Sequence, residues 1–116
     1  MRHGNRRGRL GRATDQRTAM LRSIVMSLLT YGKIRVTQAR AKEARRLAES
    51  VIELAKRGDL HSRRKAISMV SNADVVKKIF GEAPKRFAER KGGYTRMTLI
   101  GRRVGDAAQH VLLELI

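Results

Sequence analysis

The first twelve residues carry side chains whose chemistry is phosphate binding. Five are arginines, three are glycines and none is acidic. A guanidinium group presents a planar fork of N–H donors that matches the oxygens of a phosphate. Because the stretch has too few apolar residues to fold alone, we expect a flexible basic arm over residues 1–13, with a solvated tail as the alternative. The binding residues predicted in this arm are Arg2, His3, Arg6, Arg7, Arg9 and Arg12.

The whole chain is strongly basic. It has 27 Lys+Arg against 10 Asp+Glu, a formal net charge of +17 on 116 residues. Such a domain repels itself and is stabilised by a counter-charge, which nucleic acid, an anionic membrane surface or an acidic protein could supply. No apolar run is long enough to span a membrane, and there is no tryptophan to anchor a helix at its surface. Nucleic acid is therefore the favoured partner, and no membrane is expected.

Residue patterns typical of catalysis or metal binding are missing. The sequence has no cysteine, and its histidines, His3, His61 and His110, are not spaced as metal ligands. It contains no phosphate-binding loop or dinucleotide fingerprint. The ten acids leave a catalytic carboxylate pair open, but several fall in helix first turns or helical pairs, where a structural role suffices. We predict no enzyme activity, metal, cofactor or small-molecule substrate.

The periodicity of apolar residues indicates the elements that position the basic side chains. Leucine, isoleucine and valine recur at helical spacing between residues 21 and 29, which predicts a helix over 15–31 that Gly32 ends. Residues 33–37 alternate as a short strand. Thr37 is placed to cap a second helix, over 38–57, that Gly58 ends.

The second half of the chain predicts shorter pieces. Ser62 is placed to cap one short helix, Asn72 to cap another that ends at Gly81, and Pro84 to begin a last piece that runs to Glu89. Residues 94–100 and 110–116 read as strands that pair antiparallel across a basic loop. The expected fold is a single α+β domain, residues 14–116, with helices packed on a small sheet.

Basic residues of this domain extend the predicted nucleic-acid surface. Those in the first half of the helix over 38–57 have a solvated face as the alternative interpretation. Tyr94 could stack on an unpaired base, as could His3, although a role in the core suits Tyr94 equally well. The predicted residues are Arg17, Arg22, Lys33, Arg35, Arg40, Lys42, Arg63, Arg64, Tyr94, Arg96, Arg102 and Arg103.

Several short motifs are spread from the first residue to the last strand. They are Met1-Arg2-His3, Leu10-Gly11-Arg12, Met20-Leu21-Arg22, Ala41-Lys42-Glu43, the stretch from Leu54 to His61 with Arg63-Arg64, Gly92-Gly93-Tyr94-Thr95-Arg96, Arg102-Arg103, Gly105-Asp106-Ala107 and Glu114-Leu115. Together these motifs resemble the bacterial large-subunit ribosomal protein L-seventeen (L17) family. Departures from the family pattern are Ser23, where asparagine is common, and Met97-Thr98.

The resemblance implies a structural constituent of the cytoplasmic ribosome. It implies binding to large-subunit ribosomal RNA near the polypeptide exit, contact with neighbouring large-subunit proteins and no catalysis. It further implies helices packed on a small mixed sheet of about three strands. An architectural DNA-binding protein of the nucleoid is the alternative function.

Overall fold

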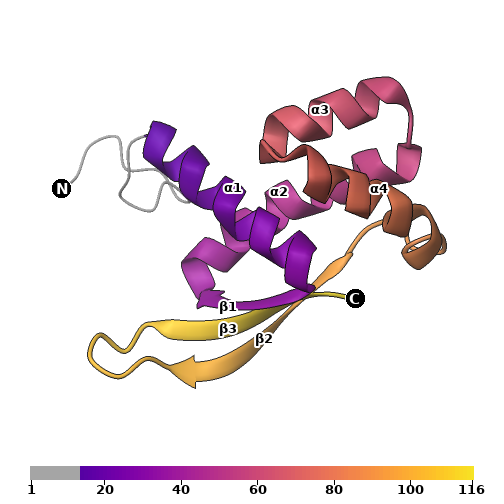
Figure 1. Ribbon diagram of the computed structural model, residues 1–116. Helices are drawn as coiled ribbons and strands as arrows, with labels where there is room; N and C mark the ends of the chain where they lie inside the picture. Colours follow the sequence, from indigo (N-terminus) through magenta and orange to yellow (C-terminus); the bar gives the residue numbers. More distant parts are fainter. Residues whose placement is uncertain (1–13) are drawn as a thin grey trace.

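The computed structural model describes residues 14–116 as four helices on one face of a three-stranded sheet (Figure 1). The predicted arm, residues 1–13, lies outside this described part. The helices are α1 (Thr14–Tyr31), α2 (Gln38–Arg57), α3 (Leu60–Val70) and α4 (Ala73–Arg86). The strands are β1 (Lys33–Thr37), β2 (Thr95–Arg102) and β3 (Gln109–Leu115). The α+β class and the bounds of β1 and α2 agree with the sequence-based prediction.

The sheet has the order β1-β3-β2 and is antiparallel throughout. The expectation of a mixed sheet is therefore wrong. The two strands that run in the same direction, β1 and β2, are separated by β3, so no parallel pair forms. Alternation along β3 buries Val111, Leu113 and Leu115 on the face toward the helices.

Helix α2 lies at the centre of the fold and contacts every other helix and strand of the described residues. Its buried face is rich in alanine, whose small side chain allows neighbouring backbones to approach closely. Ala41, Ala44, Ala48 and Ala55 are fully buried there. Across from α2, α1 contributes Val25, Leu28 and Leu29 to the same core.

Helices α3 and α4 differ from the sequence-based prediction, and α1 begins one residue earlier than predicted, at Thr14. Helix α3 is capped by Asp59 and not by Ser62, because the Asp59 carboxylate accepts a hydrogen bond of 3.2 Å from the backbone N–H of Ser62. Helix α4 is capped by Asn72 as predicted, but it continues past Gly81 and Pro84 to Arg86.

Burial explains why α4 is not interrupted. Phe80, Ala83 and Phe87 follow one another at helical spacing and are all buried, so one continuous helix satisfies the core. The φ angle of Gly81 is not positive, unlike that of a typical helix-ending glycine. The helix therefore ends at Arg86, and its C-cap residue is Phe87, whose N–H donates to the carbonyl of Ala83.

Tyr94 lies in the core with 1% of its surface exposed. Its ring packs edge-on against Phe87, with 5.1 Å between ring centroids. Its hydroxyl donates to the carboxylate of Glu53 and accepts a 3.2 Å hydrogen bond from the ammonium group of Lys56. The buried ring is not available to stack on a base, so the structure assigns Tyr94 to the core, the second of its two predicted roles.

The core assignment of α1 predicts different effects for two of its residues. Leu28 is fully buried, so Leu28→Ala should lower the free energy of unfolding by roughly 2–5 kcal/mol. Arg22 is half-buried and donates a 3.1 Å hydrogen bond to the carbonyl of Ser68, so Arg22→Ala should cost only about 0.5–1.5 kcal/mol. Urea unfolding of both variants, in a protein first shown to unfold cooperatively, measures this difference. Equal stability of Leu28→Ala and the parent would contradict the packing assignment.

The buried Tyr94 hydroxyl predicts a loss of stability in alkali. Burial, followed by the hydrogen bond to Glu53, raises the pKa of Tyr94 above its ordinary value. The stabilisation is then complete below the pKa of an unfolded tyrosine, about 10, and is lost as the pH rises through the higher folded value. The free energy of unfolding, measured across this pH range, should fall more steeply with rising pH for the parent than for Tyr94→Phe.

The matched control is Tyr31→Phe, because Tyr31 is 75% exposed. Its alkaline decline should equal that of the parent. If the free energy of unfolding depends on pH identically in Tyr94→Phe and the parent, ionisation of the Tyr94 hydroxyl does not destabilise the folded state.

Candidate nucleic-acid interface

Three of the predicted arginines converge on one groove of about 420 Å³, which we call the basic groove. Arg35 comes from β1, Arg40 from α2 and Arg103 from the loop between β2 and β3, and His110 of β3 joins them. No acid is among the lining residues within the described part of the chain. The remaining lining residues are Met20, Ser23, Ile24, Val36 and Thr37.

The fold assembles this groove from distant parts of the chain. Strand β1 passes directly into α2, which places Arg35 and Arg40 on either side of the junction. The antiparallel register sets His110 opposite Thr37. Arg103 follows β2, and its N–H donates a 2.8 Å hydrogen bond to Ala108 that closes the loop of the hairpin.

The first turn of α2 makes the groove more positive. It contains no acidic residue, and Thr37 occupies the N-cap position without a capping hydrogen bond from its side chain. Thr37 therefore occupies the predicted N-cap position but does not make the predicted capping hydrogen bond. A helix N-terminus carries a partial positive charge and unpaired N–H groups, and Arg40 adds a full charge to the same turn. The repulsion between these positive charges lowers the stability of the free protein, and a bound anion such as phosphate removes that repulsion.

The basic groove adjoins a smaller hollow of about 240 Å³ between α1 and β1. The two share Ser23, Ile24, Arg35 and Val36, and the smaller one adds Ser27 and Ile34. Serine hydroxyls beside an arginine suit a sugar–phosphate backbone, which needs hydrogen-bond partners for both phosphate and ribose oxygens.

Asp106 orders the loop that carries Arg103. Its carboxylate accepts a 3.0 Å hydrogen bond from Arg103 Nε and another of 3.1 Å from the N–H of Ala108. The guanidinium, the largest influence, holds the pKa of Asp106 well below its usual range, while the carboxylate raises the pKa of Arg103. Both side chains are exposed, so the pair contributes little stability and mainly orients Arg103.

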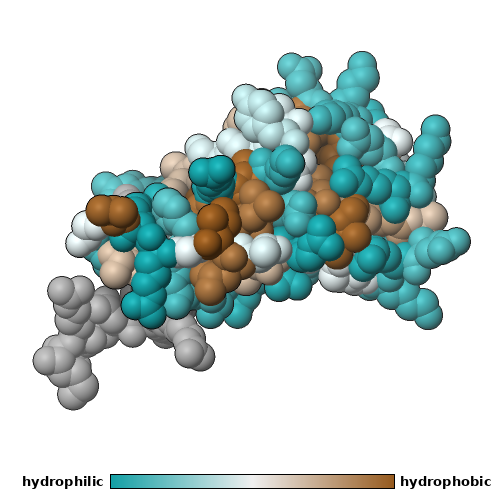
Figure 2. Space-filling view, turned by 90° about the horizontal axis from the view of Figure 1, so that it is seen from below, coloured by the Kyte–Doolittle hydropathy of each residue, from teal (hydrophilic) through white to brown (hydrophobic). Residues whose placement is uncertain are grey.

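The other predicted residues of the domain do not join this groove. Arg96 pairs with Glu114 at 2.9 Å, Arg63 lies over the ring of Phe80 at 5.5 Å, and Arg22 binds the Ser68 carbonyl. Lys33 borders an apolar hollow together with Ile34, Ile100, Leu112 and Arg35 of the basic groove. Figure 2, which views the molecule from below, shows hydrophobic residues among hydrophilic ones. Arg17, Lys42, Arg64 and Arg102 are half-buried or exposed elsewhere. Arg2, His3, Arg6, Arg7, Arg9 and Arg12 lie outside the described residues.

His110 lies in the groove although its sequence context did not indicate a binding residue. The signal that could have identified it is the pairing of residues 33–37 with the last strand, which sets it beside the start of α2. Ser23 of α1 is likewise a lining residue that the pattern of charges did not indicate.

Residues 14–116 lack the features of two other kinds of site. They contain no group of three or more histidine, aspartate or glutamate side chains placed to hold a metal ion. None of their helices combines the length and the apolar character that crossing a membrane requires.

Known proteins similar to this chain are ribosomal. The family described as ribosomal protein L17 matches residues 20–116. The large ribosomal subunit protein bL17 of Clostridium perfringens strain SM101 is 56% identical over 108 residues, covering 93% of this chain and 96% of the relative. That of Clostridium acetobutylicum is also 56% identical over 108 residues, covering 93% and 95%. These comparisons indicate a ribosomal protein and not an enzyme. The chain belongs to the ribosomal protein L17 family.

Proposed function

We propose that this protein is a structural component of the large ribosomal subunit that binds ribosomal RNA through the basic groove and the arm. The observation that carries the proposal is the convergence of Arg35, Arg40, Arg103 and His110 around the uncapped start of α2. Relatives of this chain are named as large-subunit proteins, which supports the same assignment.

The mechanism is electrostatic. Phosphates that approach one another in folded RNA repel, and cationic side chains between them remove that cost. Contacts of this kind position the protein, while the shape of the RNA and its 2′-hydroxyls supply the specificity. Ser23 and Ser27 lie where such hydroxyls could be bound.

The arm, residues 1–13, is proposed to continue the basic groove. It joins the domain, residues 14–116, at Thr14, and Met20 of the groove follows only six residues later. Six residues of α-helix span about 9 Å, so the first described residue of the domain lies close to the groove.

Neighbouring ribosomal proteins are the second class of proposed partner. The β2–β3 hairpin exposes apolar side chains that RNA does not require, namely Leu99 and Ile100, at least half exposed, and Val104, 99% exposed. These suit contact with another protein. A position in the cytoplasmic ribosome near the polypeptide exit is proposed on the family resemblance, and cross-linking within ribosomes tests it.

Nuclease treatment of cell extracts separates this function from the alternative, an architectural protein of bacterial DNA. The protein should sediment with ribosomes, leave that fraction after RNase treatment, and stay in it after DNase treatment. Immunoblotting of the gradient fractions measures this. Release by DNase alone would refute the ribosomal proposal and favour DNA.

The salt dependence of binding tests the groove. Each phosphate contact contributes about 0.7–0.9 to the slope of log affinity against log salt. The double variant Arg35→Gln/Arg40→Gln should therefore lower the slope by about 1–2 on a large-subunit ribosomal RNA transcript, and deletion of residues 2–12 should lower it further.

The matched control is Lys77→Gln/Lys85→Gln, which removes the same charge from exposed positions on α4. Its slope should stay close to that of the parent. Equal slopes for the two double variants would mean that the basic groove is no more important than the rest of the surface.

A further inference from the structure

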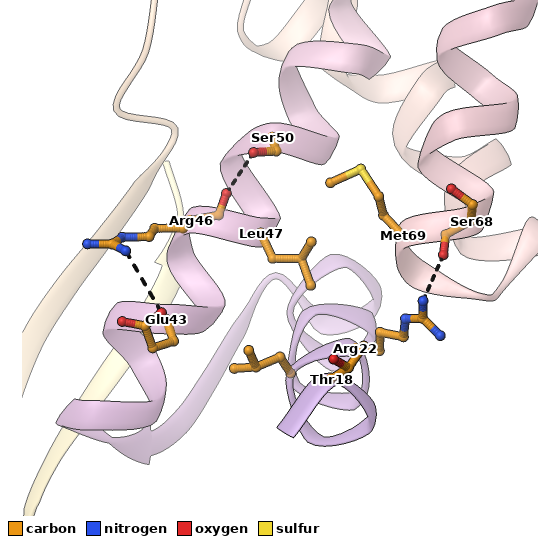
Figure 3. A pocket seen from close by; sticks show the side chains of 9 residues that line it. Thr18, Arg22, Glu43, Arg46, Leu47, Ser50, Ser68 and Met69 are labelled. Atoms are coloured by element: carbon orange, nitrogen blue, oxygen red, sulfur yellow. Dashed lines mark hydrogen bonds and ion pairs between the residues drawn. The ribbon is translucent and has the colours of Figure 1, made fainter. Parts of the chain in front are cut away.

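A second groove, of about 560 Å³, lies between α1, α2 and α3 and shares no lining residue with the basic groove (Figure 3). We call it the interhelical groove. Its lining combines apolar side chains, hydroxyls, two arginines and one carboxylate. The residues are Thr18, Leu21, Arg22, Glu43, Arg46, Leu47, Ser50, Ser68 and Met69.

The floor of the interhelical groove is apolar. Leu21, Leu47 and Met69 are only partly buried and pack against the core, and Figure 3 shows Leu47 and Met69 extending into the space between the helices. A nucleobase has flat faces that prefer apolar contacts, and a methionine sulfur interacts favourably with an aromatic ring. This floor therefore suits the face of an unpaired base.

Two arginines are among its lining residues, and Figure 3 shows that Arg46 extends away from Met69, on the side of α2 where it pairs with Glu43. Arg22 uses one nitrogen to bind the Ser68 carbonyl at 3.1 Å, which fixes its guanidinium beside the groove and leaves further N–H donors. The side chain of Arg46 is 83% exposed. Both can bind the phosphates that flank a base lying on the floor.

Glu43 is the acid among the lining residues of the interhelical groove. Its side chain is only 22% exposed, and its ion pair with Arg46 measures 4.0 Å, too long for a hydrogen bond. A carboxylate can accept two parallel hydrogen bonds. Among the standard bases, guanine presents two adjacent donors on its Watson–Crick edge, the N1–H and the N2 amine. A base with acceptors facing the carboxylate is repelled.

We propose that the interhelical groove receives an unpaired guanine of the RNA. The rings lie on Leu21, Leu47 and Met69, the N1–H and N2 amine donate to Glu43, and the adjoining phosphates meet the arginines. This inference rests on the proposed RNA-binding function and names a base that it recognises. The volume of the groove leaves room for the ribose as well.

Four RNA hairpins that differ in one unpaired nucleotide test the proposal with the full chain. The nucleotide is guanosine, adenosine, uridine or an abasic residue. Stacking of one base is worth about 1–3 kcal/mol, so the guanosine hairpin should bind roughly 5- to 150-fold more tightly than the abasic one. It should also bind more tightly than the adenosine and uridine hairpins. Methyl resonances of Leu21, Leu47 and Met69 should shift with guanosine and stay in place with the abasic hairpin.

The variant Glu43→Gln should lose the preference for guanosine over adenosine while its circular dichroism stays that of the parent. Removal of one negative charge raises affinity for every hairpin, so the ratio of affinities is the quantity to compare. Glu89→Gln makes the same charge change at an exposed position and should keep the parental ratio.

Equal affinity of the parent for the guanosine and abasic hairpins, or binding to none of the four, would overturn the proposal. Equal affinity for guanosine and adenosine would overturn the role of Glu43. The proposed function is judged separately, since it fails only if the parent does not bind the large-subunit ribosomal RNA transcript in the same buffer.

Discussion

Close packing against the alanine face of α2 is the constraint on which the rest of this structure depends. The helix touches every other element of residues 14–116, and methyl side chains at its contact positions let those elements approach it directly. The first turn of the same helix forms part of the basic groove. One helix thus organises both the core and the surface that carries the proposed function, so its position determines where the binding side chains stand.

The few acids of this basic chain are largely engaged within the protein. Glu53 accepts from Tyr94, Glu49 accepts from Arg45 and Thr95, and Glu114 pairs with Arg96. Glu49 and Glu53 thereby join α2 to the segment that begins β2. These three carboxylates lie outside the basic groove, and among residues 14–116 Asp106 is the acid that pairs with one of its arginines, Arg103. The charges of Arg35 and Arg40 are thereby left for the proposed RNA contact.

Local signals were sufficient for much of the fold. The spacing of Leu28 and its neighbours identified the buried face of α1, and alternation identified β1 and β3. The predictions for helices α3 and α4 failed for different reasons. Gly81 and Pro84 resemble helix breakers, but burial of Phe80 and Phe87 keeps α4 continuous. Asp59 and Ser62 are both good caps, and the sequence contains no sign of which one the chain uses.

The site was less predictable because it depends on long-range pairing. Arg35, Arg40 and Arg103 were recognised as basic residues, but their convergence requires the register of β1 with β3. Alternation alone does not specify that partner. The same pairing sets an order of events during synthesis. Arg103 and His110 emerge from the ribosome after every helix, so the complete groove exists only once β3 has been made. A nascent chain therefore presents residues 1–13 before the groove is complete, and the proposed binding through the groove requires a chain synthesised through β3.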